Sequence, residues 1–296
     1  MLQITATQTV KNYVEVTKPP IVFLLVFTSV ATMIIALRQL TLPLNLTTLV
    51  IATMAIASAS AGCDTLTSYV DRDIDAVMKR TKHRPIPSGR ITPTNALVWG
   101  LFLAAVGLVL ALWINPLSFL WIAFGVVDNV VVYSLYLKRR HPLNIILGGV
   151  SGGMPVMFGW SAVTGGMTLL PVLLAALVVL WIPGHIWSLA IFTKEDYTRA
   201  RIPMLPVVTN LSTALRCIVS TVVLMIPFSL LIWWVGGFGL LYLAVAIGFG
   251  IWVLYINVKL FLHPNSKLAY QAFKVSSPYL FALFFVMIVD SFAKIL

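Results

Sequence analysis

The side chains best suited to bind a metal ion are two aspartates four residues apart, Asp71 and Asp75. This spacing places both on one face of a helix. The same face, followed backward, reaches Thr67 or Ser68 and then Asp64, which lies inside an apolar stretch where a carboxylate is costly and usually functional. Magnesium typically takes one or two carboxylates and completes its shell with water and phosphate. The stripe therefore predicts a magnesium site at a membrane surface.

A second acidic segment contains Glu195 and Asp196. Stepping back from Asp196 along a helix by four, three and four residues reaches His185, about three turns deeper. We expect the two acidic segments to converge on one divalent ion. The alternative for each acidic segment is a solvated helix end whose carboxylates pair with nearby basic side chains. The alternative for His185 is a packing or hydrogen-bonding role, which is more common for a single histidine in a membrane helix.

Basic side chains follow the first acidic segment and end the fourth predicted span, and they are suited to hold a leaving diphosphate. Arginine grips phosphate with two parallel hydrogen bonds, whereas lysine acts as a point charge. The alternative is the excess of cations that cytoplasmic loops of membrane proteins carry anyway. The candidate groups are Lys79, Arg80, Lys82, Arg84, Arg90, Lys138, Arg139 and Arg140.

The elements that position these groups must be membrane helices. Only 10% of the 296 residues are charged, against about 25% in a soluble domain. Long uncharged stretches, each continuously apolar, predict helices and exclude a barrel with alternating polarity. The predicted spans are about 20–38, 47–69, 93–113, 117–137, 143–163, 169–190, 211–234, 238–258 and 276–294, divided at Asn115-Pro116, Thr164-Gly165-Gly166 and Gly236-Gly237.

The fold class is therefore an all-α polytopic membrane protein, a single domain over residues 1–296. With the N-terminus in the cytoplasm, the outer side keeps only Arg38 and Lys294 of the 20 lysines and arginines. The positive-inside rule then places both acidic segments at the cytoplasmic face. The first apolar run is a full span rather than a signal peptide. The N-terminus is also not an Arg- and Ser-rich transit peptide, which favours a prokaryotic plasma membrane over an organelle. The net charge of +11 is mostly this topology signal, and nothing else supports nucleic-acid binding. Cys63 and Cys217 indicate neither a disulfide nor a metal cluster.

Several segments along the whole chain resemble the UbiA superfamily of intramembrane prenyltransferases, and within it the branch that farnesylates heme. DRDIDAVMKRT followed by RPIPSGR is the most specific of them. The segments are Tyr13–Pro19, Asp71–Ile91, Val132–Gly149, Gly152–Gly165, His185–Val208 and Ser276–Asp290.

The resemblance implies a nine-helix bundle around a central cavity open to the cytoplasm. It implies that farnesyl diphosphate and water are joined to a vinyl group of heme b, giving heme O and diphosphate, with Mg²⁺ as cofactor. It leaves open whether a heme A synthase or a terminal oxidase docks alongside. The site residues expected are catalytic Asp71, Asp75 and Asp196; metal ligands Asp64, Asp71, Asp75, Glu195 and Asp196; diphosphate contacts Lys79, Arg80, Arg84, Arg90, Lys138 and Arg139; and acceptor contacts His185, Trp187 and Tyr133.

Two positions depart from the family pattern. Thr67 stands where the family usually has asparagine, and we expect Asp64, one turn deeper, to replace part of that ligand. Pro20 stands where the family usually has a basic residue. Two alternatives remain. The acceptor could be an aromatic acid, a quinone precursor, a chlorophyll-type pigment or a glycerol lipid. A secondary transporter could use Asp64 and Asp128 as ion sites, although the nearly uncharged outer loops argue against it.

Overall fold

The computed structural model describes residues 6–293. Within them, nine helical segments are long and apolar enough to cross a membrane, as predicted. Three short helices, α4 (Arg72–Val77), α10 (Lys194–Arg199) and α11 (Leu205–Val208), lie between spans, and α1 (Ala6–Val16) precedes them. The spanning segments are α2 (Pro19–Gln39), α3 (Leu46–Val70), α5 (Pro93–Ile114), α6 with η1 (Pro116–Val127 and Asp128–Leu137), α7 with η2 and α8 (Asn144–Gly148, Gly149–Gly153 and Met154–Thr164), α9 (Leu169–Phe192), α12 (Leu211–Gly236), α13 (Leu240–Leu262) and α14 (Ser266–Ala293).

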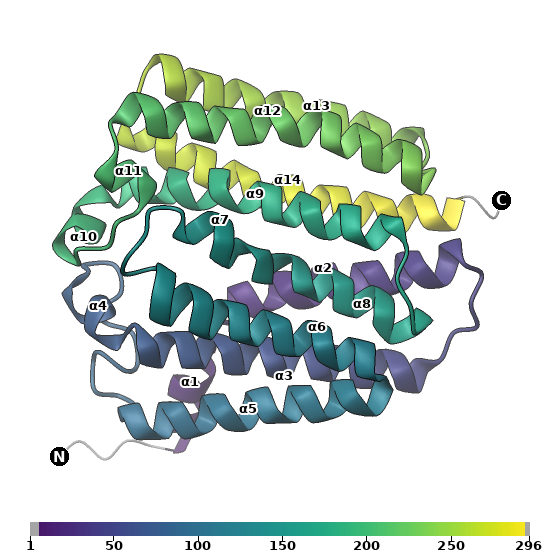
Figure 1. Ribbon diagram of the computed structural model, residues 1–296, viewed down its shortest axis with the longest axis horizontal. Helices are drawn as coiled ribbons and strands as arrows, with labels where there is room; N and C mark the ends of the chain where they lie inside the picture. Colours follow the sequence, from purple (N-terminus) through teal and green to yellow (C-terminus); the bar gives the residue numbers. More distant parts are fainter. Residues whose placement is uncertain (1–5, 294–296) are drawn as a thin grey trace.

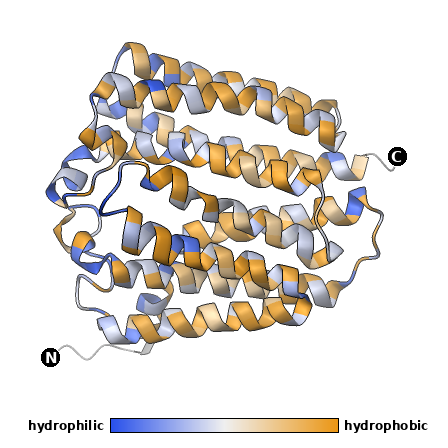
Figure 2. Ribbon diagram, viewed as in Figure 1, coloured by the Kyte–Doolittle hydropathy of each residue, from blue (hydrophilic) through white to orange (hydrophobic). Residues whose placement is uncertain are grey.

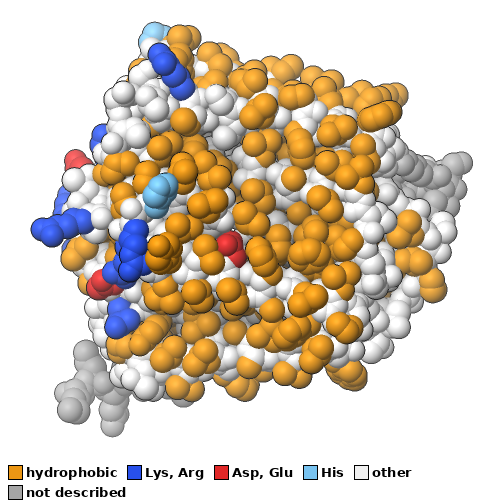
Figure 3. All heavy atoms as spheres, viewed as in Figure 1, with side chains coloured by type: hydrophobic (Ala, Val, Ile, Leu, Met, Phe, Trp, Pro, Cys, Tyr) orange, Lys and Arg blue, Asp and Glu red, His pale blue; other side chains and the backbone are white. Residues whose placement is uncertain are grey.

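The long helices lie side by side along one common direction (Figure 1). The short helices α4, α10 and α11 gather at one end, together with α1. Hydrophilic residues are concentrated in the loops at that end, whereas the helices between the two ends are mostly apolar (Figure 2). Lysine and arginine side chains cluster at the same end of the visible face, beside a broad apolar band (Figure 3). We call this the charged end.

Local sequence signals fix where several spans begin and end. The Asn115 side chain accepts a hydrogen bond from the Ser118 N–H, and Pro116 occupies the first turn of α6. Gly165 and Gly237, with φ of 71° and 55°, end α8 and α12 in the left-handed conformation that glycine adopts without strain. The three predicted division points are therefore confirmed.

Close helix contacts depend on small residues. A Cβ atom added at Gly62 of α3 would overlap the backbone of Ala104 in α5. One added at Gly159 of α8 would overlap the carbonyl group of Ser29 in α2. Because lipid provides little hydrophobic force between helices, such close packing is a main source of their association.

The last span begins earlier than predicted, at Ser266 instead of residue 276. Asn265 accepts a hydrogen bond from the Leu268 N–H at 2.8 Å and starts the helix there. Lys267 and Lys274 are exposed on its first turns, so their charges do not interrupt the helix. The predicted end at residue 294, with Lys294, lies outside the described residues.

Candidate active site

A cavity of about 580 Å³ lies among the spanning helices. Its wall contains charged side chains contributed by α3, α4, η1 and the loops of the charged end. The remaining lining, from α2, α6, α8, α9 and α14, is largely apolar and includes Leu24, Trp121 and Ile182. The cavity thus joins a charged mouth to a hydrophobic interior, and the predicted central cavity is present.

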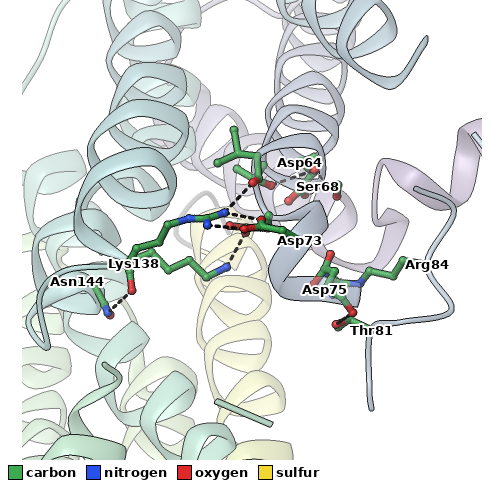
Figure 4. A network of polar contacts seen from close by, with 12 residues as sticks. Asp64, Ser68, Asp73, Asp75, Thr81, Arg84, Lys138 and Asn144 are labelled. Atoms are coloured by element: carbon green, nitrogen blue, oxygen red, sulfur yellow. Dashed lines mark hydrogen bonds and ion pairs between the residues drawn. The ribbon is translucent and has the colours of Figure 1, made fainter. Parts of the chain in front are cut away.

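Three aspartates of the first acidic stripe line this cavity and are buried. Each of them is paired with a cation that also lines the cavity, so the charges are balanced locally. Figure 4 shows the Asp75–Arg84 pair to one side of α4 and the Asp73 and Lys138 side chains to the other. The pairs are Asp64 with Lys18 at 3.2 Å, Asp71 with Lys138 at 2.5 Å and Asp75 with Arg84 at 2.9 Å.

Two carboxylate oxygens at this site lack a hydrogen-bond partner. They are Oδ2 of Asp64 and Oδ1 of Asp71, both buried. A buried carboxylate oxygen without a partner is costly, and an oxygen-binding cation would relieve that cost. Carboxylate oxygens are the ligands that magnesium prefers. The residues present therefore fit a magnesium ion.

Lys18 is a cavity residue that the sequence argument did not select. Its Nζ donates to Asp64 Oδ1 at 3.2 Å and to Thr67 Oγ1 at 2.9 Å. Its backbone is left-handed, with φ of 54°, immediately before the Pro19-Pro20 start of α2. Such a conformation is uncommon and costly for a lysine. The lysine thus occupies the region where Asp64 and Thr67 were expected to bind metal.

The π-helical segment η1 brings Lys138 to the cavity. Asn129, Tyr133, Ser134 and Lys138 all line the cavity, at spacings of four to five residues. The Lys138 N–H donates to the Tyr133 carbonyl at 2.8 Å, which is the i to i−5 bond of a π-helix. In an α-helix with 3.6 residues per turn, Asn129 and Lys138 would face opposite sides. The wider turn therefore places Lys138 beside Asp71.

Electrostatics keep Lys138 charged. Burial lowers the pKa of its ammonium group, but the charge of the Asp71 carboxylate and its hydrogen bond oppose this, and the net effect is a raised pKa. Asp71 accepts its hydrogen bond. The cavity mouth therefore has a partly buried group that stays positively charged.

Asp196 and Glu195 are at the charged end but are not part of the cavity lining. Asp196 accepts hydrogen bonds from the backbone N–H groups of Lys79 at 2.9 Å and Arg80 at 3.2 Å. Glu195 is 86% exposed and lies 3.9 Å from the Lys79 ammonium group. The described residues contain no group of three or more acidic, histidine or cysteine side chains arranged to hold a metal. A divalent ion shared by the two acidic segments therefore stays a prediction. A metal role for Glu195 and Asp196 stays a prediction.

The predicted diphosphate contacts divide into two groups. Arg80, Arg84 and Lys138 line the cavity, whereas Lys79, Arg90 and Arg139 do not. Arg139 forms two hydrogen bonds of 2.7 Å with the exposed Asp73 and, being the main partner, lowers the pKa of that carboxyl to about 2. Arg90 pairs with Glu15 and Arg139 with Asp73, and neither arginine lines the cavity.

Arg90 holds α1 against the loop that follows α4. Its guanidinium group donates to Glu15 at 2.6 and 2.7 Å, to Asn12 and to the His83 carbonyl. The hydrogen bond from Arg90 lowers the pKa of Glu15. Arg90 therefore joins α1 to this loop and has a structural role.

Two of the three predicted acceptor contacts line the cavity. Tyr133 does so, with the Lys138 ammonium group 5.7 Å from its ring centre. His185 does so from α9, between the rings of Trp181 and Phe273, each with its centre 4.3 Å away. Trp187 is only 2% exposed and packs in a separate apolar cluster at the charged end. Because it lies two residues beyond His185, it faces the neighbouring helices instead.

Asp128, which the transporter interpretation required, is a structural cap. Its Oδ2 accepts a hydrogen bond from the Ser151 N–H at 2.9 Å, in the 3₁₀ turn η2. It does not line the cavity. The buried carboxylate is therefore explained without ion transport.

Comparison with known proteins adds family information to this geometry. The model of the UbiA prenyltransferase family matches residues 24–287. A protoheme IX farnesyltransferase from Desulforudis audaxviator is 53% identical, with 95% of this chain and 89% of the relative covered. A protein of the same name from Thermoplasma volcanium is 41% identical, with 94% and 96% covered.

Solved structures share the fold. A digeranylgeranylglyceryl phosphate synthase has a TM-score of 0.77 at 22% identity, covering 97% of this chain and 99% of that one. A UbiA homolog from Archaeoglobus fulgidus, described as bound to GPP and Mg²⁺, has a TM-score of 0.66 at 16% identity, covering 94% and 99%. The fold, the cavity and the sequence relatives agree, and the chain belongs to the UbiA prenyltransferase family.

Proposed function

We propose that this protein transfers the farnesyl group of farnesyl diphosphate to a vinyl group of heme b, with addition of water, giving heme O and diphosphate. The name of the relative that is 53% identical over nearly the whole chain supports this activity. The observation that carries the proposal is the cavity itself. It combines buried carboxylates and cations at one end with an apolar interior suited to a prenyl chain.

Magnesium is the proposed cofactor. The unpartnered oxygens of Asp64 and Asp71 are the first ligands available, and Asp75 joins them when Arg84 turns to the substrate. The Archaeoglobus fulgidus homolog described with GPP and Mg²⁺ supports a divalent ion at such a site. When bound, the ion supplies positive charge that stabilises the leaving diphosphate.

The cations of the mouth bind the diphosphate directly. We propose that Lys138, Arg84 and Lys18 exchange their aspartate partners for phosphate oxygens as the substrate enters. Their preplaced positive charge stabilises the negative charge that develops as the C1–O bond breaks. The allylic cation left behind is flanked by the Tyr133 ring, whose face attracts positive charge. The apolar cavity wall keeps bulk water from this cation.

Asp196 contributes by positioning. Its carboxylate fixes two backbone N–H groups of the loop that carries Arg80 into the cavity lining. Without this cap, the Arg80 side chain would be less ordered at the mouth. Loss of Asp196 should therefore weaken diphosphate binding even if it never touches the metal.

The protein is a multi-pass membrane protein, and we propose that its charged end faces the cytoplasm at the cell membrane. The lysines and arginines supporting this orientation include those of α4, the loop after it and α10. Cytoplasmic loops carry such an excess. Farnesyl diphosphate would then enter from the cytoplasm while its tail remains in the apolar interior.

The direct test uses purified protein, Mg²⁺, heme b and farnesyl diphosphate, with products read by mass. We expect a hydroxyethylfarnesyl porphyrin that disappears when Mg²⁺ is chelated. A parallel reaction with 4-hydroxybenzoate tests the alternative acceptor class. Prenylated 4-hydroxybenzoate without a farnesylated porphyrin would overturn the proposal.

A further inference from the structure

Of the two ring nitrogens of His185, Nδ1 has a side-chain hydrogen-bond partner. Nδ1 lies 2.6 Å from the hydroxyl group of Ser276 in α14. The ring also has a polar contact with the Phe273 carbonyl group beside Ser276, and it lines the cavity. The question is which nitrogen carries the proton, because that decides what Nε2 offers to a ligand.

The partners of Ser276 answer this question. The Ser276 hydroxyl donates its only proton to the Phe273 carbonyl at 2.8 Å, so it can only accept from His185. Nδ1 must then be the donor and carry the hydrogen. Nε2 is left with a lone pair directed away from Ser276.

Aromatic packing fixes the plane of the same ring. Trp181 stacks on one side at 23° and Phe273 on the other at 30°, each centre 4.3 Å from that of His185. Trp181 is in turn held by a hydrogen bond from its Nε1 to the Ser276 carbonyl at 2.9 Å. One short stretch of α14 therefore controls both the tautomer and the orientation of the imidazole.

We infer that His185 Nε2 is an axial ligand of the heme iron and that Ser276 is the positioning residue that keeps this nitrogen unprotonated. The inference rests on the proposed function, in which heme b is the acceptor substrate. A neutral imidazole whose other nitrogen is held by a hydrogen bond is the usual form of a metal-binding histidine. His185 lies about 12 Å from the charged end of α9, eight residues before Thr193. This depth suits a porphyrin that reaches toward the mouth.

The test is a heme titration of the purified full-length protein without farnesyl diphosphate. Wild type should give the absorption spectrum of nitrogen-ligated heme b, and His185→Ala should lose it, with added imidazole restoring it. His263→Ala, which removes an exposed histidine, should leave the spectrum unchanged. An unchanged spectrum in His185→Ala would overturn the assignment.

Ser276→Ala tests the positioning role. It should retain a ligated spectrum but bind heme about 10–100-fold more weakly, as loss of such a supporting hydrogen bond does elsewhere. Ser188→Ala removes a buried hydroxyl from the same helix as His185, where it bonds only the Gly184 carbonyl, and is the matched control. Ser276→Thr should recover most of the affinity. Equal affinity of Ser276→Ala and wild type would refute the role.

Failure of this inference is distinguishable from failure of the function. If wild type farnesylates heme b but His185→Ala shows an unaltered heme spectrum, only the ligand assignment falls. If wild type forms no farnesylated porphyrin, the proposed function falls whatever the spectra show. Zinc protoporphyrin IX and metal-free protoporphyrin IX, titrated alongside, should show dependence on His185 only when a metal is present.

Discussion

Lys138 and Arg139 are neighbours in sequence but have different surroundings. Lys138 lies in the cavity wall against Asp71 with 14% of its side chain exposed, whereas Arg139 pairs with Asp73 outside the cavity. Both were predicted from the sequence as diphosphate contacts, because the sequence does not show toward which side of the helix each of two adjacent cations points. The structure separates them through the π-helical geometry of η1.

This difference gives a matched pair of variants. Lys138→Met should lower kcat/KM for farnesyl diphosphate by about 10²–10³-fold, the usual cost of removing a preplaced charge at a developing anion. Arg139→Gln should change it less than about fivefold, because its charge is exposed and paired elsewhere. Initial rates at saturating heme b provide the measurement. Equal losses in both variants would contradict the assignment of Lys138 to the site.

Lys18 and Asp64 form a largely buried ion pair at the site, with side-chain exposures of 18% and 10%. Removing one member of a buried pair leaves the other uncompensated, at a cost of up to about 3–5 kcal/mol. We therefore expect Lys18→Met and Asp64→Asn each to lower the melting temperature in detergent, and the double variant to be more stable than additivity predicts.

The same variants test the metal role of Asp64. Asp64→Asn should raise the Mg²⁺ concentration needed for half-maximal turnover, as Asp71→Asn should, because each removes an unpartnered buried oxygen. Lys18→Met should instead raise KM for farnesyl diphosphate. Strictly additive stabilities together with an unaltered Mg²⁺ dependence would show that the pair serves neither purpose.

At the scale of elements, α1 is attached to the loop after α4 by Arg90, with Val16, Ile86, Ile91 and Ala96 packed beneath. Arg84 belongs to the same loop but points into the cavity. Arg90→Gln should therefore expose α1 to proteolysis and leave farnesyl diphosphate binding within a few fold. Arg84→Gln should weaken farnesyl diphosphate binding and leave α1 protected from proteolysis. Binding measured by calorimetry and cleavage near α1 separate the two roles, and a loss of binding in both variants would argue against them.

The same clamp should depend on pH. Because Arg90 lowers the folded pKa of Glu15 below its usual 4.5, the pair stabilises the attachment fully above that value. The stabilisation is lost as the pH falls through the lowered pKa. Protection of α1 from an acid-active protease should thus decrease in wild type as the pH falls through the lowered pKa of Glu15, and it should be low at every pH in Arg90→Gln.

Sequence alone predicted the spans well, because charge-free stretches and turn residues such as Asn115-Pro116 act locally. The start of α14 was not predicted, because its first turns carry exposed lysines and extend beyond the apolar stretch. The sequence also could not show that Asp196 would cap the loop at Lys79 and Arg80, since that contact joins residues far apart in the chain. Lys18 was missed for the same reason: only the fold brings it to Asp64.

At the scale of the whole molecule, the charged end has to face the cytoplasm for the proposed substrate to reach the cavity. Thr41 and Lys82 are exposed, at the opposite and the charged end respectively. In a background with Cys63→Ala and Cys217→Ser, Thr41→Cys should react with an impermeant maleimide on intact cells. Lys82→Cys should react only after the membrane is opened, because cations are retained on the inner side. Each variant must keep heme-farnesylating activity, which shows that it is inserted correctly. Labelling of Lys82→Cys on intact cells would place the site outside and exclude a cytoplasmic supply of farnesyl diphosphate.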